Sequence, residues 1–141
     1  EGNVTDQTVA EDMARVRAVY DRLKIQAELA PFFTDLPARL ASNHLVVSRS
    51  GATTVAELAV CGKRAVLIPY PFAADNHQEH NARSLAKRGG CEVIVQKDLT
   101  PAKLAAVIQR FARDRDGAMS PLASTAAEEI VRACKEHVQK D

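Results

Sequence analysis

The chain has 141 residues, of which 46% are hydrophobic and 26% are charged, and its formal net charge is +1. This size and balance predict one domain, residues 1–141, with a sizeable core; no basic run or patch suggests a nucleic-acid partner. The longest apolar run, residues 65–70, is far shorter than the ~20 residues of a membrane span, and three scattered cysteines fit thiols in a reducing compartment. We therefore expect a soluble, cytoplasmic domain.

The predicted elements alternate between helix and strand along the chain. Helical spacing behind a Thr8-x-x-Glu11 capping box predicts a first helix over residues 9–23. Short apolar runs predict strands at 26–32, 44–48, 64–70 and 91–95. Further helices are expected at 35–42, 54–61, 77–87, 99–114 and 124–139.

Glycine, threonine and proline mark several of the expected helix ends. Gly62 is expected to end the helix at 54–61, and Gly89–Gly90 the helix at 77–87. Thr100 is expected as the N-cap of the next helix, with Pro101 as its first residue. Short apolar strands separated by single helices predict an α/β fold, a Rossmann-like doubly wound parallel sheet covered on both faces.

Ligands of such sheets bind beyond the carboxyl ends of the strands, where this sequence places three polar loops. In the loop SRSGATT, Gly51 would let a ligand approach closely, and Ser50, Thr53 and Thr54 carry hydroxyl groups. The loop is either a phosphate cradle or only a well-capped helix start. Glu57 would accordingly accept the two hydroxyl groups of a ribose or close a Thr54-x-x-Glu57 capping box.

The other two loops also leave alternatives open. In PYPFAADNHQEHNA, His77-x-x-His80 could suggest a metal site, but amide and imidazole groups at a helix start fit sugar hydroxyls better. The plainer alternative is a solvated helix start capped by Asp75. In PFFTDL, the Phe32 and Phe33 rings either pack in the core or flank a planar base. Arg49 is either a surface charge or a phosphate partner.

The order and spacing of three elements are similar to one known family. These elements are P-F-F-x-D-[LM], R-S-G-A-x-T-V-x-E and P-Y-P-x-A-x-x-x-H-Q-x-x-N-A, beginning at residues 31, 49 and 69. Together they resemble the C-terminal domain of the bacterial peptidoglycan glycosyltransferases that join N-acetylglucosamine from UDP-N-acetylglucosamine to lipid I, forming lipid II. The resemblance covers nearly the whole chain and implies half of a GT-B fold.

The resemblance implies a role for each loop. The uracil would meet Phe32, Phe33 and Leu36, and Glu57 would bind the ribose. The N-acetylglucosamine would face His77, Gln78 and Asn81, and Arg49 matches the family pattern as a further substrate-binding residue. The residues expected at the diphosphate are Ser50, Gly51, Ala52, Thr53 and Thr54.

The resemblance also implies what this chain lacks. The family's first C-terminal-domain strand, a G-G-S-Q-G-type loop and the whole N-terminal domain have no counterpart here, so we expect a fragment. The general base, the lipid I site and the contact with the inner face of the membrane would lie in the missing domain. No catalytic residue, cofactor or metal is therefore expected in this chain. Lys63–Arg64 replaces a commonly apolar pair and is expected to be a surface change.

Three other functions compete with this one. The chain could come from another GT-B enzyme, such as a diacylglycerol glucosyltransferase or a UDP-N-acetylglucosamine epimerase. It could instead be a stand-alone binding subunit that recruits a membrane-bound catalytic partner, or a non-catalytic Rossmann-like interaction domain.

Overall fold

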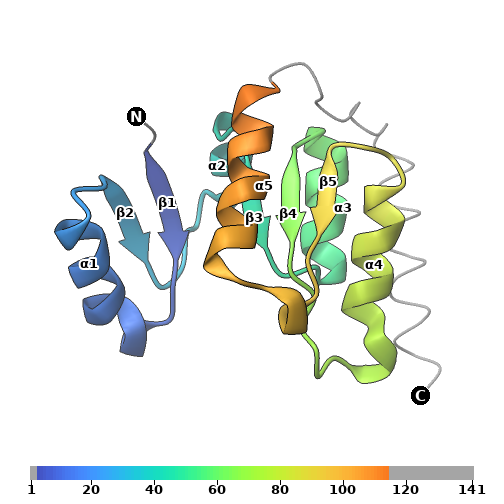
Figure 1. Cartoon of the computed structure of the whole chain (residues 1–141), viewed down its shortest axis with the longest axis horizontal. Helices are drawn as coiled ribbons and strands as arrows, with labels where there is room; N and C mark the ends of the chain where they lie inside the picture. Colours follow the sequence, from blue (N-terminus) through green and yellow to red (C-terminus); the bar gives the residue numbers. More distant parts are fainter. Residues whose placement is uncertain (1–2, 115–141) are drawn as a thin grey trace. The chain divides into compact units, whose positions relative to one another are not determined.

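The computed structural model describes residues 3–114, so the helix predicted at 124–139, with Cys134 and His137, lies outside the described residues. The chain divides into two compact units, residues 1–36 and 37–141. Both contain parallel strands joined through helices (Figure 1). This architecture confirms the predicted α/β class, with one difference: the strands form two separate parallel sheets, one in each unit.

The first unit is a single strand–helix–strand crossover. Strand β1 (Val4–Gln7) lies parallel to β2 (Ala27–Ala30), and a short 3-10 turn (Ala10–Asp12) and α1 (Met13–Arg22) connect them. The predicted capping box at the start of this helix is wrong. The chain enters α1 through the 3-10 turn, and no side chain caps either segment.

The second unit alternates helices with three-residue strands. Its elements in chain order are α2 (Leu36–Ser42), β3 (Val46–Ser48), α3 (Ala52–Cys61), β4 (Ala65–Leu67), α4 (His77–Ala86), β5 (Cys91–Val93) and α5 (Pro101–Arg113). Short 3-10 turns precede α4 and α5. The strands pair in parallel in the order β3-β4-β5.

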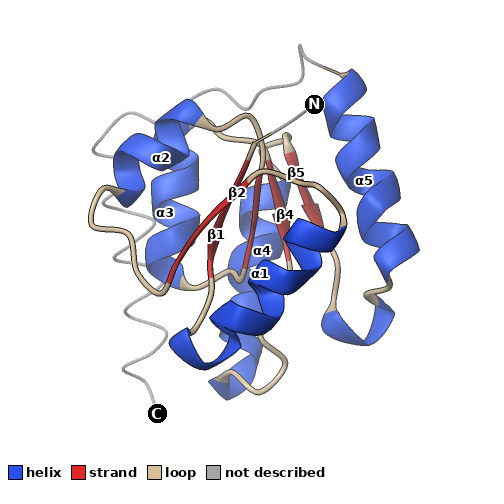
Figure 2. Ribbon diagram, turned by 90° about the vertical axis from the view of Figure 1, so that its left-hand side faces the viewer, coloured by secondary structure: helices blue, strands red, loops and turns tan. Residues whose placement is uncertain are grey.

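Helices cover both faces of this three-stranded sheet. All three residues of β4 are fully buried at the centre of the sheet. Val66 packs with Ile94 of the chain after β5 and with Val107 of α5. Figures 1 and 2 show α5 on this face and α3 on the opposite one, where α3 also contacts α4. The central strand β4 is therefore buried between two helical layers, as its apolar sequence predicted, whereas β3 and β5 are only partly covered.

The helix ends follow the local signals of the sequence. Gly62 has φ 61° and ψ 31°, the left-handed conformation that ends a helix, and Lys63 N–H then donates to the carbonyl oxygen of Leu58. The Thr100 hydroxyl accepts the N–H of Lys103 at 3.1 Å, so it is the N-cap of α5. Gly89 and Gly90 both have positive φ where α4 ends. These predictions are confirmed.

One surface prediction is wrong. Arg64 is only 6% exposed, because its guanidinium reaches the last turn of α5 and donates to the carbonyl oxygen of Phe111. Its neighbour Lys63 donates to the carbonyl oxygens of Ala41 and Asn43. Neither residue is therefore a simple surface charge. Separately, no helix within residues 3–114 is both long and apolar enough to cross a membrane.

Candidate functional site

The start of α3 presents backbone N–H groups that no side chain within residues 3–114 caps. The helix begins at Ala52, and Gly51 takes the N-cap position without any side-chain hydrogen bond. Gly51 has φ −60° and ψ 154°, which any residue adopts, so the turn itself does not require glycine. A Cβ added there would meet nothing within 4 Å. Gly51 therefore leaves open space directly in front of the first turn of α3.

The Thr54–Glu57 capping box, the alternative to a ligand site, does not form. Because the helix begins at Ala52, Thr54 is already its third residue, and Glu57 lies a full turn inside. A capping box would need Thr54 at the N-cap. The Glu57 carboxylate is partly exposed and makes no hydrogen bond to another described residue. It is thus available to accept hydrogen bonds.

Ser50 directly precedes Gly51, the N-cap of this helix, and is completely buried. Its hydroxyl donates to the carbonyl oxygen of Gln78 at 2.6 Å, so it is already engaged within the protein. Its own carbonyl oxygen accepts from the Asn81 side chain at 3.3 Å. Ser50 was expected at the diphosphate together with residues 51–54, but the structure directs its hydroxyl at α4.

The Gln78 side chain joins the β3–α3 loop to the β4–α4 loop. Its Oε1 accepts the N–H of Ser50 at 3.2 Å and the N–H of Tyr70 at 3.0 Å. The sequence placed Ser50, Gln78 and Asn81 at two different parts of one ligand. The structure brings them together through direct hydrogen bonds to one another.

The segment before α4 has an unusual backbone. Asp75 and Asn76 have φ of 48° and 56°, the left-handed region that Asn and Asp tolerate better than most residues. The alternative of a helix start capped by Asp75 is not observed, since Asn76 takes the N-cap position and its side chain makes no capping hydrogen bond. His77 is the first residue of α4. Within residues 3–114, no group of three or more His, Cys, Asp or Glu side chains could hold a metal ion.

An aromatic cluster on the β4–α4 loop was missed by the sequence reasoning. Tyr70 and Phe72 are 45% and 80% exposed, and their rings meet edge to face with centroids 5.6 Å apart. The Arg49 guanidinium lies over the Tyr70 ring at 5.6 Å and donates to the carbonyl oxygens of Ile68 and Pro69. Arg49 is therefore held against this loop. The available signal was a loop with two aromatic residues at the expected ligand edge.

In the first unit, the three residues predicted to meet a base differ in exposure. The Phe32 ring is 70% exposed, whereas Phe33 is 6% exposed and belongs to the core. Leu36, the first residue of α2, is partly buried. Only Phe32 thus presents a ring to solvent, and Phe33 can offer a ligand little beyond its backbone.

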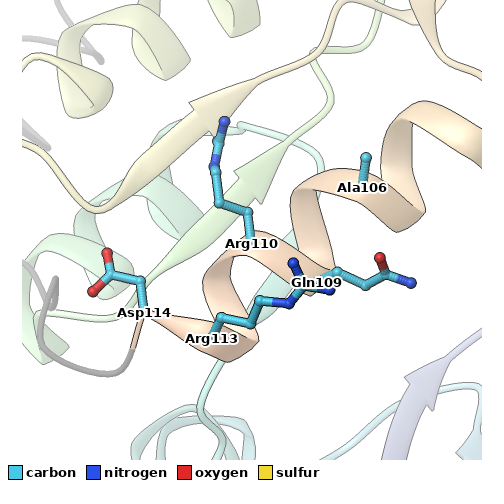
Figure 3. Close-up of a pocket in the computed structure, with 5 residues that line it drawn as sticks. All are labelled: Ala106, Gln109, Arg110, Arg113 and Asp114. Carbon is cyan, nitrogen blue, oxygen red and sulfur yellow. The ribbon is translucent and has the colours of Figure 1, made fainter.

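A separate hollow lies beside α5. It has a volume of about 510 Å³ and is lined by Ala106, Gln109, Arg110, Arg113 and Asp114 (Figure 3). Arg110 pairs with Glu92 of β5. None of the predicted site residues lines this hollow.

Two side chains outside the predicted site have clearly raised pKa values. Burial raises the pKa of the Cys91 thiol to about 11, partly offset by a hydrogen bond from the backbone of Ala65. Burial and a hydrogen bond to the Asp6 carboxylate raise the pKa of Tyr20 to about 12. Both groups stay protonated at neutral pH.

The comparisons with known proteins agree with the sequence elements. The UDP-N-acetylglucosamine--N-acetylmuramyl-(pentapeptide) pyrophosphoryl-undecaprenol N-acetylglucosamine transferase of Nitrobacter hamburgensis is 56% identical over 124 residues, covering 86% of this chain and 34% of the relative. The protein of the same name from Rhodopseudomonas palustris (strain HaA2) is 61% identical over 111 residues, 79% of this chain and 30% of the relative. The chain thus spans about a third of the length of these relatives.

Two solved structures share the fold of this chain. The crystal structure of Acinetobacter baumannii MurG matches with a TM-score of 0.74 and 26% identity, covering 96% of this chain and 38% of that one. The glycotransferase of kitacinnamycin, at 15% identity and a TM-score of 0.56, shares the fold. The model of the glycosyltransferase family 28 C-terminal domain matches residues 1–138. These matches confirm the resemblance, and the chain belongs to the glycosyltransferase family 28 C-terminal domain family.

Proposed function

We propose that this chain is the donor-binding part of a transferase that moves N-acetylglucosamine from UDP-N-acetylglucosamine to lipid I, forming lipid II. The name shared by relatives that are 56% and 61% identical supports the activity. The observation that carries the proposed site is the uncapped start of α3, with open space at Gly51.

The diphosphate is proposed to bind at this helix start. The N–H groups of Ala52, Thr53 and Thr54 have no helical acceptor, because they belong to the first turn of α3. The helix dipole adds a partial positive charge of about half an elementary charge at the same end. As the bond to the sugar breaks, these groups would stabilise the negative charge that develops on the departing UDP.

The remaining parts of the donor are assigned from the sequence elements. Glu57 would accept the ribose hydroxyl groups, which agrees with its partly exposed, unengaged carboxylate. His77 opens α4 and would face the sugar. The proposed uracil contacts are the exposed Phe32 ring, the backbone of Phe33 and the side chain of Leu36.

The acceptor half of the reaction is proposed to belong to another part of the protein. The matched relatives extend well beyond the third of their length that this chain covers. We assign the general base, the lipid I site and any contact with the inner face of the cytoplasmic membrane to that remaining part. The proposed location is accordingly the cytoplasm, and no cofactor is needed for the donor role.

Isothermal titration calorimetry tests the donor role. The chain should bind UDP-N-acetylglucosamine and UDP, and bind GDP-mannose at least tenfold more weakly, because the base contacts would differ. A variant with Gly51→Val fills the open space before α3 and should abolish UDP binding while the protein stays folded. Equal affinity for UDP-N-acetylglucosamine and GDP-mannose, or full UDP binding by Gly51→Val, would contradict the proposal.

A further inference from the structure

We propose that Gln78 is a positioning residue: it fixes the start of α3, and with it the diphosphate site, through hydrogen bonds to the backbone of two loops. This inference rests on the proposed function for the identity of the ligand. It differs from the sequence-based assignment, in which Gln78 only faces the sugar.

The first observation is that one side-chain oxygen atom of Gln78 accepts two backbone hydrogen bonds. Gln78 Oε1 accepts the N–H of Ser50 and the N–H of Tyr70, at 3.2 and 3.0 Å. A carbonyl oxygen has two lone pairs, so this atom is fully used inside the protein. Because the two N–H groups belong to the β3–α3 and β4–α4 loops, the Gln78 side chain sets the spacing between them.

The second observation is that all three polar groups of Ser50 are held by α4. Besides its N–H, the Ser50 hydroxyl donates to the Gln78 carbonyl oxygen at 2.6 Å, and its carbonyl oxygen accepts from Asn81. Gln78 and Asn81 are three residues apart and therefore share one face of α4. Ser50 is completely buried, so water cannot replace these contacts.

The position of Ser50 connects this network to the ligand. Ser50 directly precedes Gly51, the N-cap of α3. Gln78 holds the peptide group before Ser50 and Asn81 holds the one after it, and the second of these leads into the first turn of α3. Loss of the Gln78 acceptor would leave the buried Ser50 N–H without a partner, and the loop would move to satisfy it. The direction of the α3 N–H groups would change with the loop.

Substitution of Gln78 by methionine tests the inference when the affinities for UDP and for UDP-N-acetylglucosamine are compared. Gln78→Met keeps the side-chain length and removes the acceptor oxygen. We expect its affinity for UDP and for UDP-N-acetylglucosamine to fall by the same factor, about tenfold. A loss confined to UDP-N-acetylglucosamine would show that Gln78 acts only on the sugar and would overturn the inference. Glu79→Gln, which changes the next residue and its exposed pair with Arg83, is the matched control and should bind both ligands normally.

Amide hydrogen exchange without ligand tests the same inference independently of the proposed function. The Ser50 and Tyr70 amides should exchange at least tenfold faster in Gln78→Met than in the wild type. Gln78→Glu retains oxygen acceptors and should restore slow exchange at both amides. Unchanged exchange in Gln78→Met would overturn the inference.

Failure of the proposed function, or failure of a variant to fold, can be distinguished from failure of the inference about Gln78. If the wild type binds no UDP, the proposed function fails, and amide exchange still decides the role of Gln78. If Gln78→Met does not fold, Ser50→Ala serves instead, because it removes only the hydroxyl contact to the Gln78 carbonyl oxygen. It should weaken both ligands equally by a smaller factor; an unequal loss would overturn the inference.

Discussion

The guanidinium of Arg64, buried beside β4, donates a hydrogen bond to the main-chain carbonyl oxygen of Phe111, 2.8 Å away and 47 residues later in the sequence. Phe111 lies in the last turn of α5, where carbonyl oxygens have no helical N–H partner. The same guanidinium lies 5.9 Å from the centre of the Phe111 ring. Arg64 therefore caps the C-terminal end of α5, where a positive charge also complements the helix dipole.

Replacing Arg64 should destabilise the protein. We expect Arg64→Met to lower the free energy of unfolding by about 2 kcal/mol, because a buried hydrogen bond to a charged donor is lost and the Phe111 carbonyl oxygen stays unpaired. Urea unfolding would measure this change. Arg64→Lys retains a charged donor and should lose less. Equal unfolding midpoints for wild type and Arg64→Met would contradict the capping role.

Glu57 should matter for binding and not for folding. In Glu57→Ala, the affinity for UDP-N-acetylglucosamine should fall at least tenfold, since a charged acceptor of two hydroxyl groups is removed. The free energy of unfolding should change by no more than about 0.5 kcal/mol, because Glu57 caps nothing and alanine favours a helix interior. Calorimetry and thermal unfolding of the same samples would give both values. Loss of stability with unchanged affinity would return Glu57 to a structural role.

Asn76 should tolerate glycine but not a β-branched residue. Glycine adopts its φ of 56° without strain, whereas valine at this position would lower the free energy of unfolding by about 1–2 kcal/mol. Asn76→Gly should therefore unfold within about 0.5 kcal/mol of the wild type in urea. Ala73→Val is the control, because Ala73 has an extended backbone that accepts valine. Similar losses for Asn76→Val and Ala73→Val would show that the left-handed backbone is not the cause.

The Cys91 thiol should make stability depend on pH in the alkaline range. Burial raises its pKa from 9.0 to about 11, so the folded state holds the proton more tightly than the unfolded state. The contribution of the protonated Cys91 thiol to the free energy of unfolding is fully present below about pH 9 and is lost as the pH rises through 11. Urea unfolding at pH 8 and 10.5 should show a smaller decline in Cys91→Ala than in the wild type. Tyr20 is present in both proteins, so its effect on the pH dependence cancels in the comparison. An equal fall in the free energy of unfolding in wild type and Cys91→Ala would contradict the prediction.

The sequence predicted those features that depend on neighbouring residues. Gly62 and the Thr100–Pro101 pair mark helix ends because their effect is local, through backbone conformation and a bond over three residues. The Thr54–Glu57 box failed for a local reason as well. The helix begins at Ala52 with Gly51 at the N-cap, so Thr54 lies inside the first turn and cannot cap it.

Other features depend on contacts between distant segments, and no local pattern marks them. Arg64 looked like a surface charge because its acceptor belongs to a helix 47 residues away. The sequence likewise indicated that Ser50, Gln78 and Asn81 matter, but it could not show that they bond to one another. That pairing depends on how α3 and α4 pack.

The bonds between Ser50 and the first turn of α4 have a consequence for chimeric enzymes. We expect the β3–α3 loop and the β4–α4 loop to be transplantable only together, since they share the hydrogen bonds of Ser50 with Gln78 and Asn81. A chimera that imports residues 68–81 from a relative with another donor preference should therefore import residues 49–54 with them. Exchanging either loop alone would pair mismatched partners, whereas exchanging both would keep the hydrogen bonds between them.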